Sequence, residues 1–341
     1  MNAIVLPHRK VEDWKYSDLR GAVDAEAVSR APTAMWAIGT AQGKLDISDL
    51  PRLVPFGAHG VMADIAASLA KAGRFIRIPK GESASIELDL KDGGHGRVVI
   101  VVEEGASLII IEKGASTGFT NIATEIAVGK NACLTHLRAV PLNDMVSVAD
   151  YAVMVAAGGT YRAHLADLGG KLSRTELHIA LEGEGAEAHL SGVFVLNGAH
   201  TDITTHVTHA SGKTQSTQLF KYVASGHARG VYQGKVTVAK DANGSDSRQT
   251  AKGLLLEDRA EIDLKPELEI LADDVKCAHG AAIGDLDAES LFYLRSRGIP
   301  ENEARALLMR AFLGDAVDQI EDETQREAVW KMVDAALAGL T

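Results

Sequence analysis

Apolar and polar residues alternate with a period of two through much of the middle of the chain. From Glu176 to Glu182 every second residue is apolar. Residues 260–270 continue the pattern over a longer stretch, with charged residues at 261, 263, 265, 267 and 269 and aliphatic residues on the other face. This alternation is typical of β-strands that bury one face. Such segments recur from Ile76 to Val275 without a helical pattern between them, so this region is predicted to be built of strands.

The strand segments also restart at nearly constant intervals. Short turn units begin near Ala106, Ala132, Thr160 and Ala186, at spacings of 26, 28 and 26 residues. A repeat of this length without helices favours a β-solenoid, in which each turn adds strands to stacked sheets. We therefore predict a mainly β fold with a right-handed parallel β-helix as its core. An antiparallel β-sandwich is the alternative that the alternation leaves open.

Composition agrees with a core of stacked aliphatic side chains. Aromatic residues make up 5% of the chain, whereas glycine contributes 33 of its 341 residues. Ladders of Val, Ile, Leu and Ala need few large rings, and glycine suits the many turns that a solenoid requires.

From residue 285 onward the apolar spacing becomes helical. Asp287 is expected to cap a helix that ends near Arg297, because Gly298 and Pro300 follow. A second helix is predicted from about Pro300 to Ile320. Its predicted apolar face consists of Ala304, Leu307, Leu308, Ala311 and Phe312.

A third helix is predicted to begin at a capping box formed by Thr324 and Glu327. Its apolar stripe consists of Val329, Val333, Ala336, Leu337 and Leu340. The helices are expected to cap the end of the solenoid or to form a surface for a partner, and the two roles are compatible. The chain thus divides into an N-terminal mixed and helical region (1–75), a β-helix core (76–284) and a C-terminal helical domain (285–341).

Charge and hydropathy argue against two classes of partner. The net charge of −11 disfavours nucleic acid, because binding phosphates requires clustered Lys and Arg. No apolar run approaches the roughly 20 residues of a membrane helix. The apolar start at Ile4–Leu6 is too short for a secretory signal, so a cytoplasmic location is expected.

Two patterns that often mark active sites are better explained as structure. The segment Ser211–Thr214 reads SGKT, but valine occupies position 207, where a P-loop needs glycine, so a turn is predicted. Glu182 with Glu184, and Glu267 with Glu269, share strand faces at a spacing that glycoside hydrolysis can use. Acidic outer faces are common on solenoids, so these carboxylates are expected to face solvent.

Three histidines lie close together in the sequence but not on one face. On a strand, His206 and His209 point to opposite sides of the sheet, because their positions differ by an odd number. With His200 they form a loose cluster that is not expected to bind one metal ion, and a structural role is predicted.

The pair Cys277 and His279 is the strongest candidate for chemistry. In extended chain, residues two apart project from the same side, so thiol and imidazole can share one ligand or metal. The other cysteine is Cys133, and two thiols are too few for an iron–sulfur cluster held by one chain. A buried cysteine beside a hydrogen-bonded histidine is the alternative interpretation.

The residues around this pair belong to a longer signature. From Leu271 the chain reads LADDVKCAHGAAIGDLD, and from Leu291 it reads LFYLRSRGIP. Near the other end, Arg9–Leu19 reads RKVEDWKYSDL. These segments resemble the C-terminal and N-terminal signatures of the SufB/SufD family, the scaffold proteins of the SUF iron–sulfur cluster assembly machinery. The low cysteine count is more similar to the SufD-type members of the family than to the SufB-type members.

The resemblance implies a non-enzymatic scaffold subunit that pairs with SufB and docks the ATPase SufC through its C-terminal helices. SufC would supply the nucleotide site that this chain lacks. His279 matches the histidine of the family that is proposed to join a SufB cysteine in holding the nascent cluster, and Cys277 is a second candidate ligand. The nascent iron–sulfur cluster would form transiently at the SufB interface, and no cofactor is expected to be tightly bound by this chain alone.

Two other functions are weighed beside this one. A stand-alone β-helix enzyme acting on acidic polysaccharide is disfavoured by the net charge of −11 and by the absence of a predicted secretory signal. A purely structural homodimer is compatible with the sequence, and a homodimer of the isolated chain would not refute the scaffold role.

Overall fold

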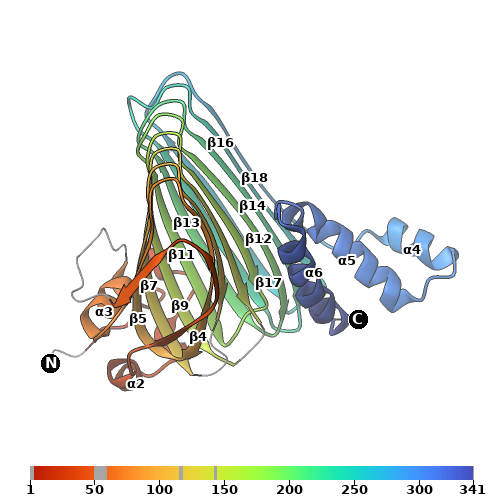
Figure 1. Ribbon diagram of the computed structural model, residues 1–341. Helices are drawn as coiled ribbons and strands as arrows, with labels where there is room; N and C mark the ends of the chain where they lie inside the picture. Colours follow the sequence, from red (N-terminus) through yellow and green to blue (C-terminus); the bar gives the residue numbers. More distant parts are fainter. Residues whose placement is uncertain (1–3, 50–59, 115–117, 142–143, 341) are drawn as a thin grey trace.

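The chain folds into a long β-solenoid flanked by helices (Figure 1). The computed structural model describes residues 4–49, 60–114, 118–141 and 144–340. Successive strands from β3 onward alternate between two sheets, so each turn of chain adds one strand to each sheet. Neighbouring strands within a sheet run parallel from turn to turn. This confirms the predicted solenoid and excludes the antiparallel sandwich.

One of the two sheets, here called sheet A, has the strand order β17-β15-β13-β11-β9-β7-β5-β3-β2. Only its first pair, β2 and β3, is antiparallel in the described part of the chain. Its strands are β2 (Asp46–Asp49), β3 (Arg74–Ile78), β5 (Gly94–Val102), β7 (Phe119–Val128), β9 (Val146–Val155), β11 (Leu172–Leu181), β13 (His200–His209), β15 (Arg229–Val238) and β17 (Glu261–Ile270).

The opposite sheet, sheet B, has the order β1-β4-β6-β8-β10-β12-β14-β16-β18. Here β1 runs antiparallel to β4, and the later strands are parallel. Its strands are β1 (Met35–Gly43), β4 (Ser83–Asp92), β6 (Ser107–Lys113), β8 (Cys133–Val140), β10 (Thr160–Asp167), β12 (Glu187–Asn197), β14 (Gln215–Ser225), β16 (Asp246–Leu255) and β18 (Lys276–Gly284).

The register of sheet B locates the start of each turn. The amides of Cys133, Thr160 and Glu187 donate to the carbonyls of Ala106, Ala132 and Gly159, each at 2.9 Å. The predicted starts at Ala106, Ala132 and Ala186 therefore match the repeat, whereas the third turn begins at Gly159, one residue before the predicted Thr160. A residue with a left-handed φ precedes each of these four starts, namely Gly105 (67°), Asn131 (53°), Gly158 (64°) and Gly185 (73°).

The core between the sheets consists of ladders of aliphatic side chains. In sheet A one ladder passes through all eight parallel strands, residue above residue, and its members are Ile76, Ile100, Ile126, Val153, Ile179, Val207, Val236 and Leu268. β-Branched side chains stack well on such a pleated surface. Seven of the eight are buried, and only the last, Leu268, is partly exposed.

The N-terminal elements pack on the outer face of sheet A. They are η1 (Glu12–Trp14), α1 (Leu19–Ala22), α2 (Ala25–Arg30) and α3 (Val61–Leu69). Leu6, Trp14 and Leu19 form a small core with Val148 and Leu172 of the sheet. The same stretch of chain also contains the strands β1 and β2.

Three helices follow the last strand: α4 (Ala288–Ser296), α5 (Glu301–Val317) and α6 (Glu323–Ala338). Asp287 caps α4 as predicted, since its carboxylate accepts a hydrogen bond from the Ser290 amide at 2.8 Å. The predicted capping box of the third helix is wrong. Asp322 is the N-cap of α6 and accepts from the Gln325 amide, so Thr324 lies within the first turn.

The predicted apolar face of α5 is also partly wrong. Leu307 is 48% exposed and Ala311 is exposed, whereas Met309, Leu313 and Val317 are buried. The reason is that α5 packs against both α6 and the outer face of sheet B, which selects a different set of apolar positions. Among the helices of the described residues, none combines the length and the hydropathy that a membrane span requires.

Candidate functional site

The C-terminal end of the solenoid is open. Strand β17 ends sheet A and β18 ends sheet B, and each has a single hydrogen-bonded neighbour in the described part of the chain. The remaining backbone edge of such a strand presents N–H and C=O groups that can pair with another chain. The end is therefore a place where a second protein can continue the sheets.

Apolar side chains are exposed at this open end. Ile270 is 42% exposed, Leu271 58% and Ile283 45%. Helices α5 and α6 pack on the outer face of sheet B rather than over β17 and β18. The interpretation of the C-terminal helices as a cap for the solenoid is therefore wrong, and the last turn keeps its inner face uncovered.

Cys277 and His279 lie on β18, in this uncovered turn. Cys277 is in register with Ser247 of β16 and His279 with Gln249, and both of these β16 residues are buried inside the solenoid. Because alternate residues of a strand share a face, thiol and imidazole both point to the inner side of the last turn. Cys277 is partly buried against the core, and His279 is exposed.

The electrostatic environment of Cys277 keeps its thiol protonated. Burial, followed by the negative charge of Asp246, raises the pKa of Cys277 above its usual value. The thiol is thus not a ready-made thiolate, and metal binding would have to displace its proton. His279 presents its ring to solvent.

The described residues do not complete a metal site around this pair. In the described residues, three potential ligand atoms from His, Cys, Asp or Glu lie within 4.8 Å of one another at Asp150, Glu176 and His178. That group is on sheet A, away from Cys277 and His279 on sheet B. A metal centre at Cys277 and His279 therefore needs further ligands from outside the described part of this chain.

The helical domain offers a second exposed surface. Helix α4 has no buried residue, and Phe292 and Tyr293 on it are 71% and 56% exposed. Figure 1 shows α4 projecting away from the solenoid beyond α5. Large exposed aromatic side chains of this kind commonly mark a protein-binding surface.

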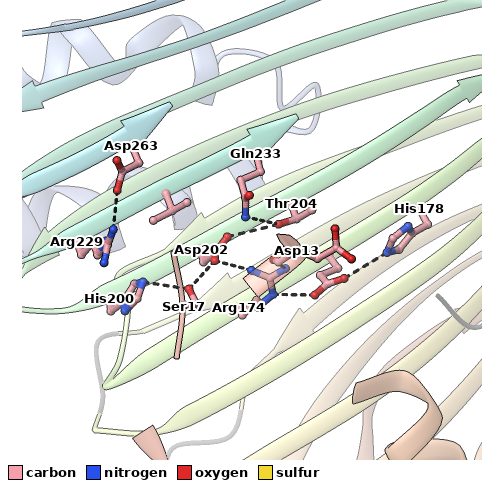
Figure 2. Close-up of polar contacts among 12 residues, drawn as sticks. Asp13, Ser17, Arg174, His178, His200, Asp202, Thr204, Arg229, Gln233 and Asp263 are labelled. Carbon is pink, nitrogen blue, oxygen red and sulfur yellow. Dashed lines mark hydrogen bonds and ion pairs between the residues drawn. The ribbon is translucent and has the colours of Figure 1, made fainter. Parts of the chain in front are cut away.

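A buried polar network lies under the N-terminal segment on sheet A (Figure 2). Arg174 of β11 is fully buried and forms ion pairs with Asp202 of β13 and with Glu176. Its guanidinium also donates to the Asp13 carbonyl at 2.6 Å and lies 4.2 Å from the centre of the Trp14 ring. One arginine thus holds the N-terminal segment to two strands of the solenoid.

Neighbouring groups of the network are also tuned by burial. Burial alone would raise the pKa of Glu176, but Arg174 and His178 lower it to about 2. Burial lowers the pKa of His200 to about 4, so its ring is neutral where it meets the Ser17 hydroxyl at 3.3 Å. Burial and the charge of Glu176 raise the pKa of Asp150 well above its usual range.

A family model described as "SUF system FeS cluster assembly, SufBD core domain" matches residues 87–312, which is more than half of the chain. This chain belongs to the SufBD family. It is a SUF-system protein of iron–sulfur cluster assembly, and its relatives include SufD. The SufBD core match contains β18, with Cys277 and His279, and all of α4.

Relatives of known sequence agree with the SufBD assignment. The iron–sulfur cluster assembly protein SufD of Escherichia coli K12 is 29% identical, over 98% of this chain and 90% of the relative. A SufBD family protein of Synechocystis is 38% identical over 66% of this chain and 52% of the relative. A SufBD family protein of Mycobacterium tuberculosis H37Rv is 27% identical over 99% of this chain and 91% of the relative.

The histidines of the loose cluster have structural environments in this SufBD chain. His209 is fully buried and hydrogen-bonds Thr214 and Ser216 at 2.8 and 2.9 Å. His206 stacks on His178 with ring centres 4.9 Å apart. None of the three belongs to the group of potential metal ligands in the described residues.

The P-loop-like segment and the paired glutamates also have structural roles. Ser211–Thr214 forms the turn between β13 and β14, with Lys213 at a left-handed φ of 55°. Glu184 and Glu269 are exposed and pair with Lys213 and Lys235 at 2.6 and 2.7 Å. These carboxylates face solvent, as predicted.

Sequence reasoning missed the Arg174 network. Asp202 and Glu176 occupy alternating polar positions that look like a solvent-facing strand surface. The sequence did contain one signal, the segment around Trp14, whose apolar residues must pack against some surface of the protein. Which surface that is depends on contacts between residues 161 positions apart, such as Asp13 and Arg174.

Proposed function

We propose that this chain is a non-enzymatic scaffold subunit of the SUF assembly complex, with His279 at the interface where a nascent iron–sulfur cluster forms. SufB is the proposed partner at the open end, and the ATPase SufC the proposed partner of the C-terminal helices. The cluster is cargo that is built and passed on. The two unpaired cysteines suit the reducing cytoplasm, where we place this work.

The observation that carries the proposal is the coincidence of three features on the last turn. Strand β18 has an unpaired edge, the end around it exposes Ile270 and Ile283, and the same strand presents His279 and Cys277. An edge and an apolar surface favour association with a second protein, and thiol and imidazole are ligand types for iron. A partner docked here would bury the candidate ligands at the centre of the new interface.

The number of ligands that a cluster needs supports a site shared between two chains. A cluster commonly takes four protein ligands, and among the described residues the thiol and imidazole on the last strand are those of Cys277 and His279. His279 is the primary ligand in our proposal, because its imidazole is exposed, whereas the Cys277 thiol must first lose a proton whose pKa is raised. The partner would supply the remaining ligands, among them thiolates.

The helical domain supports a separate docking role. Phe292 and Tyr293 stand exposed on α4, whereas α5 and α6 are anchored to sheet B through Leu313 and Val333. A partner that moves when it hydrolyses ATP can therefore grip α4 and transmit force to the solenoid through the anchored helices. SufC is the ATPase of the SUF system, so it is the proposed partner of α4.

Co-expression with SufB and SufC from the same source, followed by size-exclusion chromatography, tests the scaffold role. We expect the three chains to elute as one assembly, and removal of residues 286–341 to release SufC while SufB stays bound. Elution of this chain alone, as monomer or homodimer beside well-folded SufB and SufC, would refute the proposal.

A further inference from the structure

Three potential metal ligands meet on the outer face of sheet A. Asp150 of β9 is the direct register partner of Glu176 of β11, and His178 follows two residues later on the same face. One ligand atom of each residue lies within 4.8 Å of the other two. This group is on sheet A, whereas Cys277 and His279 are on the last strand of sheet B.

Asp150 is the observation that points to a missing ligand. The residue is 4% exposed, and the nearby guanidinium of Arg174 pairs directly with Glu176 and Asp202 rather than with the Asp150 carboxylate. A buried carboxylate without a directly paired charge is costly, and native proteins rarely leave one so. Its oxygen lies beside the other two ligand atoms, where a cation would satisfy it.

The two carboxylate oxygens of Glu176 have different partners. Its Oε1 accepts a hydrogen bond from Arg174 Nε at 2.7 Å, and its Oε2 lies 3.4 Å from His178 Nε2. Two ligands about 2.1 Å from a tetrahedral ion stand about 3.4 Å apart, so this pair already has the spacing of a metal site. Oε2 can therefore bind a metal ion without loss of the Arg174 ion pair.

The backbone at Gly60 closes over the two carboxylates. A Cβ atom at this glycine would lie 3.3 Å from Glu176 Oε2 and 3.4 Å from Asp150 Oδ2. Charge also favours a cation here, because the single guanidinium of Arg174 faces three carboxylates, those of Asp150, Glu176 and Asp202.

We propose that Asp150, Glu176 and His178 bind a divalent transition-metal ion of the zinc class. Two carboxylates and one imidazole form a mixed O and N ligand set suited to Zn²⁺ and to its neighbours Mn²⁺, Fe²⁺ and Co²⁺. The ion links β9 to β11 next to the start of α3. The site is independent of the proposed cluster interface.

Titration of the tag-free, chelator-treated chain with Zn²⁺ by calorimetry, and with Co²⁺ by visible absorption, tests the site. We expect one equivalent to bind, with Asp150→Asn and His178→Gln each weakening affinity by about tenfold or more. Asp150→Asn keeps the shape of the side chain, and His178→Gln serves if that variant fails to fold.

The matched control is His189→Gln. His189 pairs with Glu187 at 3.1 Å, much as His178 pairs with Glu176, but belongs to no group of three ligands in the described residues. This variant should bind Zn²⁺ like the wild type. The proposal is overturned if the folded wild type binds neither ion, if Asp150→Asn and His178→Gln bind both unchanged, or if His279→Ala alone abolishes binding.

Discussion

His279 of β18 lies in register with Gln249 of β16, yet Gln249 is 1% exposed and His279 is open to solvent. The two residues occupy the same position in successive turns of sheet B. They differ because a further strand covers the turn of Gln249, whereas nothing in the described chain covers the turn of His279. A protein that continues the solenoid would give His279 the burial that Gln249 already has.

Alkylation of Cys277 should report that coverage. In a Cys133→Ser background Cys277 is the single cysteine, and iodoacetamide should modify it slowly, because its pKa is raised by burial and by Asp246. Association with SufB should lower the alkylation rate of Cys277 by about a further tenfold, as measured by mass spectrometry. An unchanged rate in the complex would place the SufB surface elsewhere.

Removal of the exposed aromatic rings of α4 should weaken SufC binding. Phe292→Ala with Tyr293→Ala deletes two side chains that are 71% and 56% exposed, and aromatic anchors often carry about 2 kcal/mol each. Calorimetry should give a dissociation constant raised by about tenfold or more, with SufB binding unaffected. Lys331→Ala, an exposed change on α6, is the control. Equal SufC affinity in both variants would contradict docking on α4.

Arg174 should contribute strongly to stability. Arg174→Met leaves Asp202 and Glu176 buried without their cation, and breaking a buried ion pair in this way costs about 3–5 kcal/mol. Urea unfolding should detect this loss. Arg248→Met is the matched control, since that side chain is 73% exposed, and it should change stability by less than about 0.5 kcal/mol. Equal effects of the two substitutions would show that the network is not stabilising.

His209 should make the protein less stable in mild acid. Burial lowers its pKa from 6.5 to about 4, so between these pH values the unfolded chain binds a proton that the folded chain excludes. Stability is therefore unaffected above pH 6.5 and falls as the pH drops towards 4, by about 3 kcal/mol for this residue.

The variant His209→Gln should lack that part of the pH dependence while keeping polar contact with Thr214 and Ser216. Urea unfolding at pH 7 and at pH 4.5 measures the difference between variant and wild type at each pH. The buried histidines His164 and His200 are present in both proteins and cancel. A difference that is the same at both pH values would contradict the assignment.

The solenoid was predictable because its signal is local and repeated. Alternation at Leu177, Ile179 and Leu181 recurs in every turn, and each turn packs on its neighbours in the same way. The face of α5 was not predictable in this manner. Its apolar residues surround much of the helix, and the choice of Leu313 over Leu307 depends on where sheet B and α6 lie.

For the candidate sites, too, local features were predictable from the sequence and contacts between turns were not. That Cys277 and His279 share a face follows from strand geometry, but their exposure follows from the position of β18 as the last strand. The group of Asp150, Glu176 and His178 joins two strands a full turn apart, so no short motif marks it. Contacts between turns were visible only in the fold.

The most direct test of the account is anaerobic cluster reconstitution on the complex with SufB and SufC, comparing His279→Ala with wild type. His227→Ala, which alters an exposed histidine in the turn after β14, is the control. Circular dichroism and size-exclusion chromatography should show that both variants fold and assemble. We expect the absorption of the nascent cluster to be reduced about tenfold or more in His279→Ala and unchanged in His227→Ala. Full cluster formation in His279→Ala would remove this residue from the site and contradict the account.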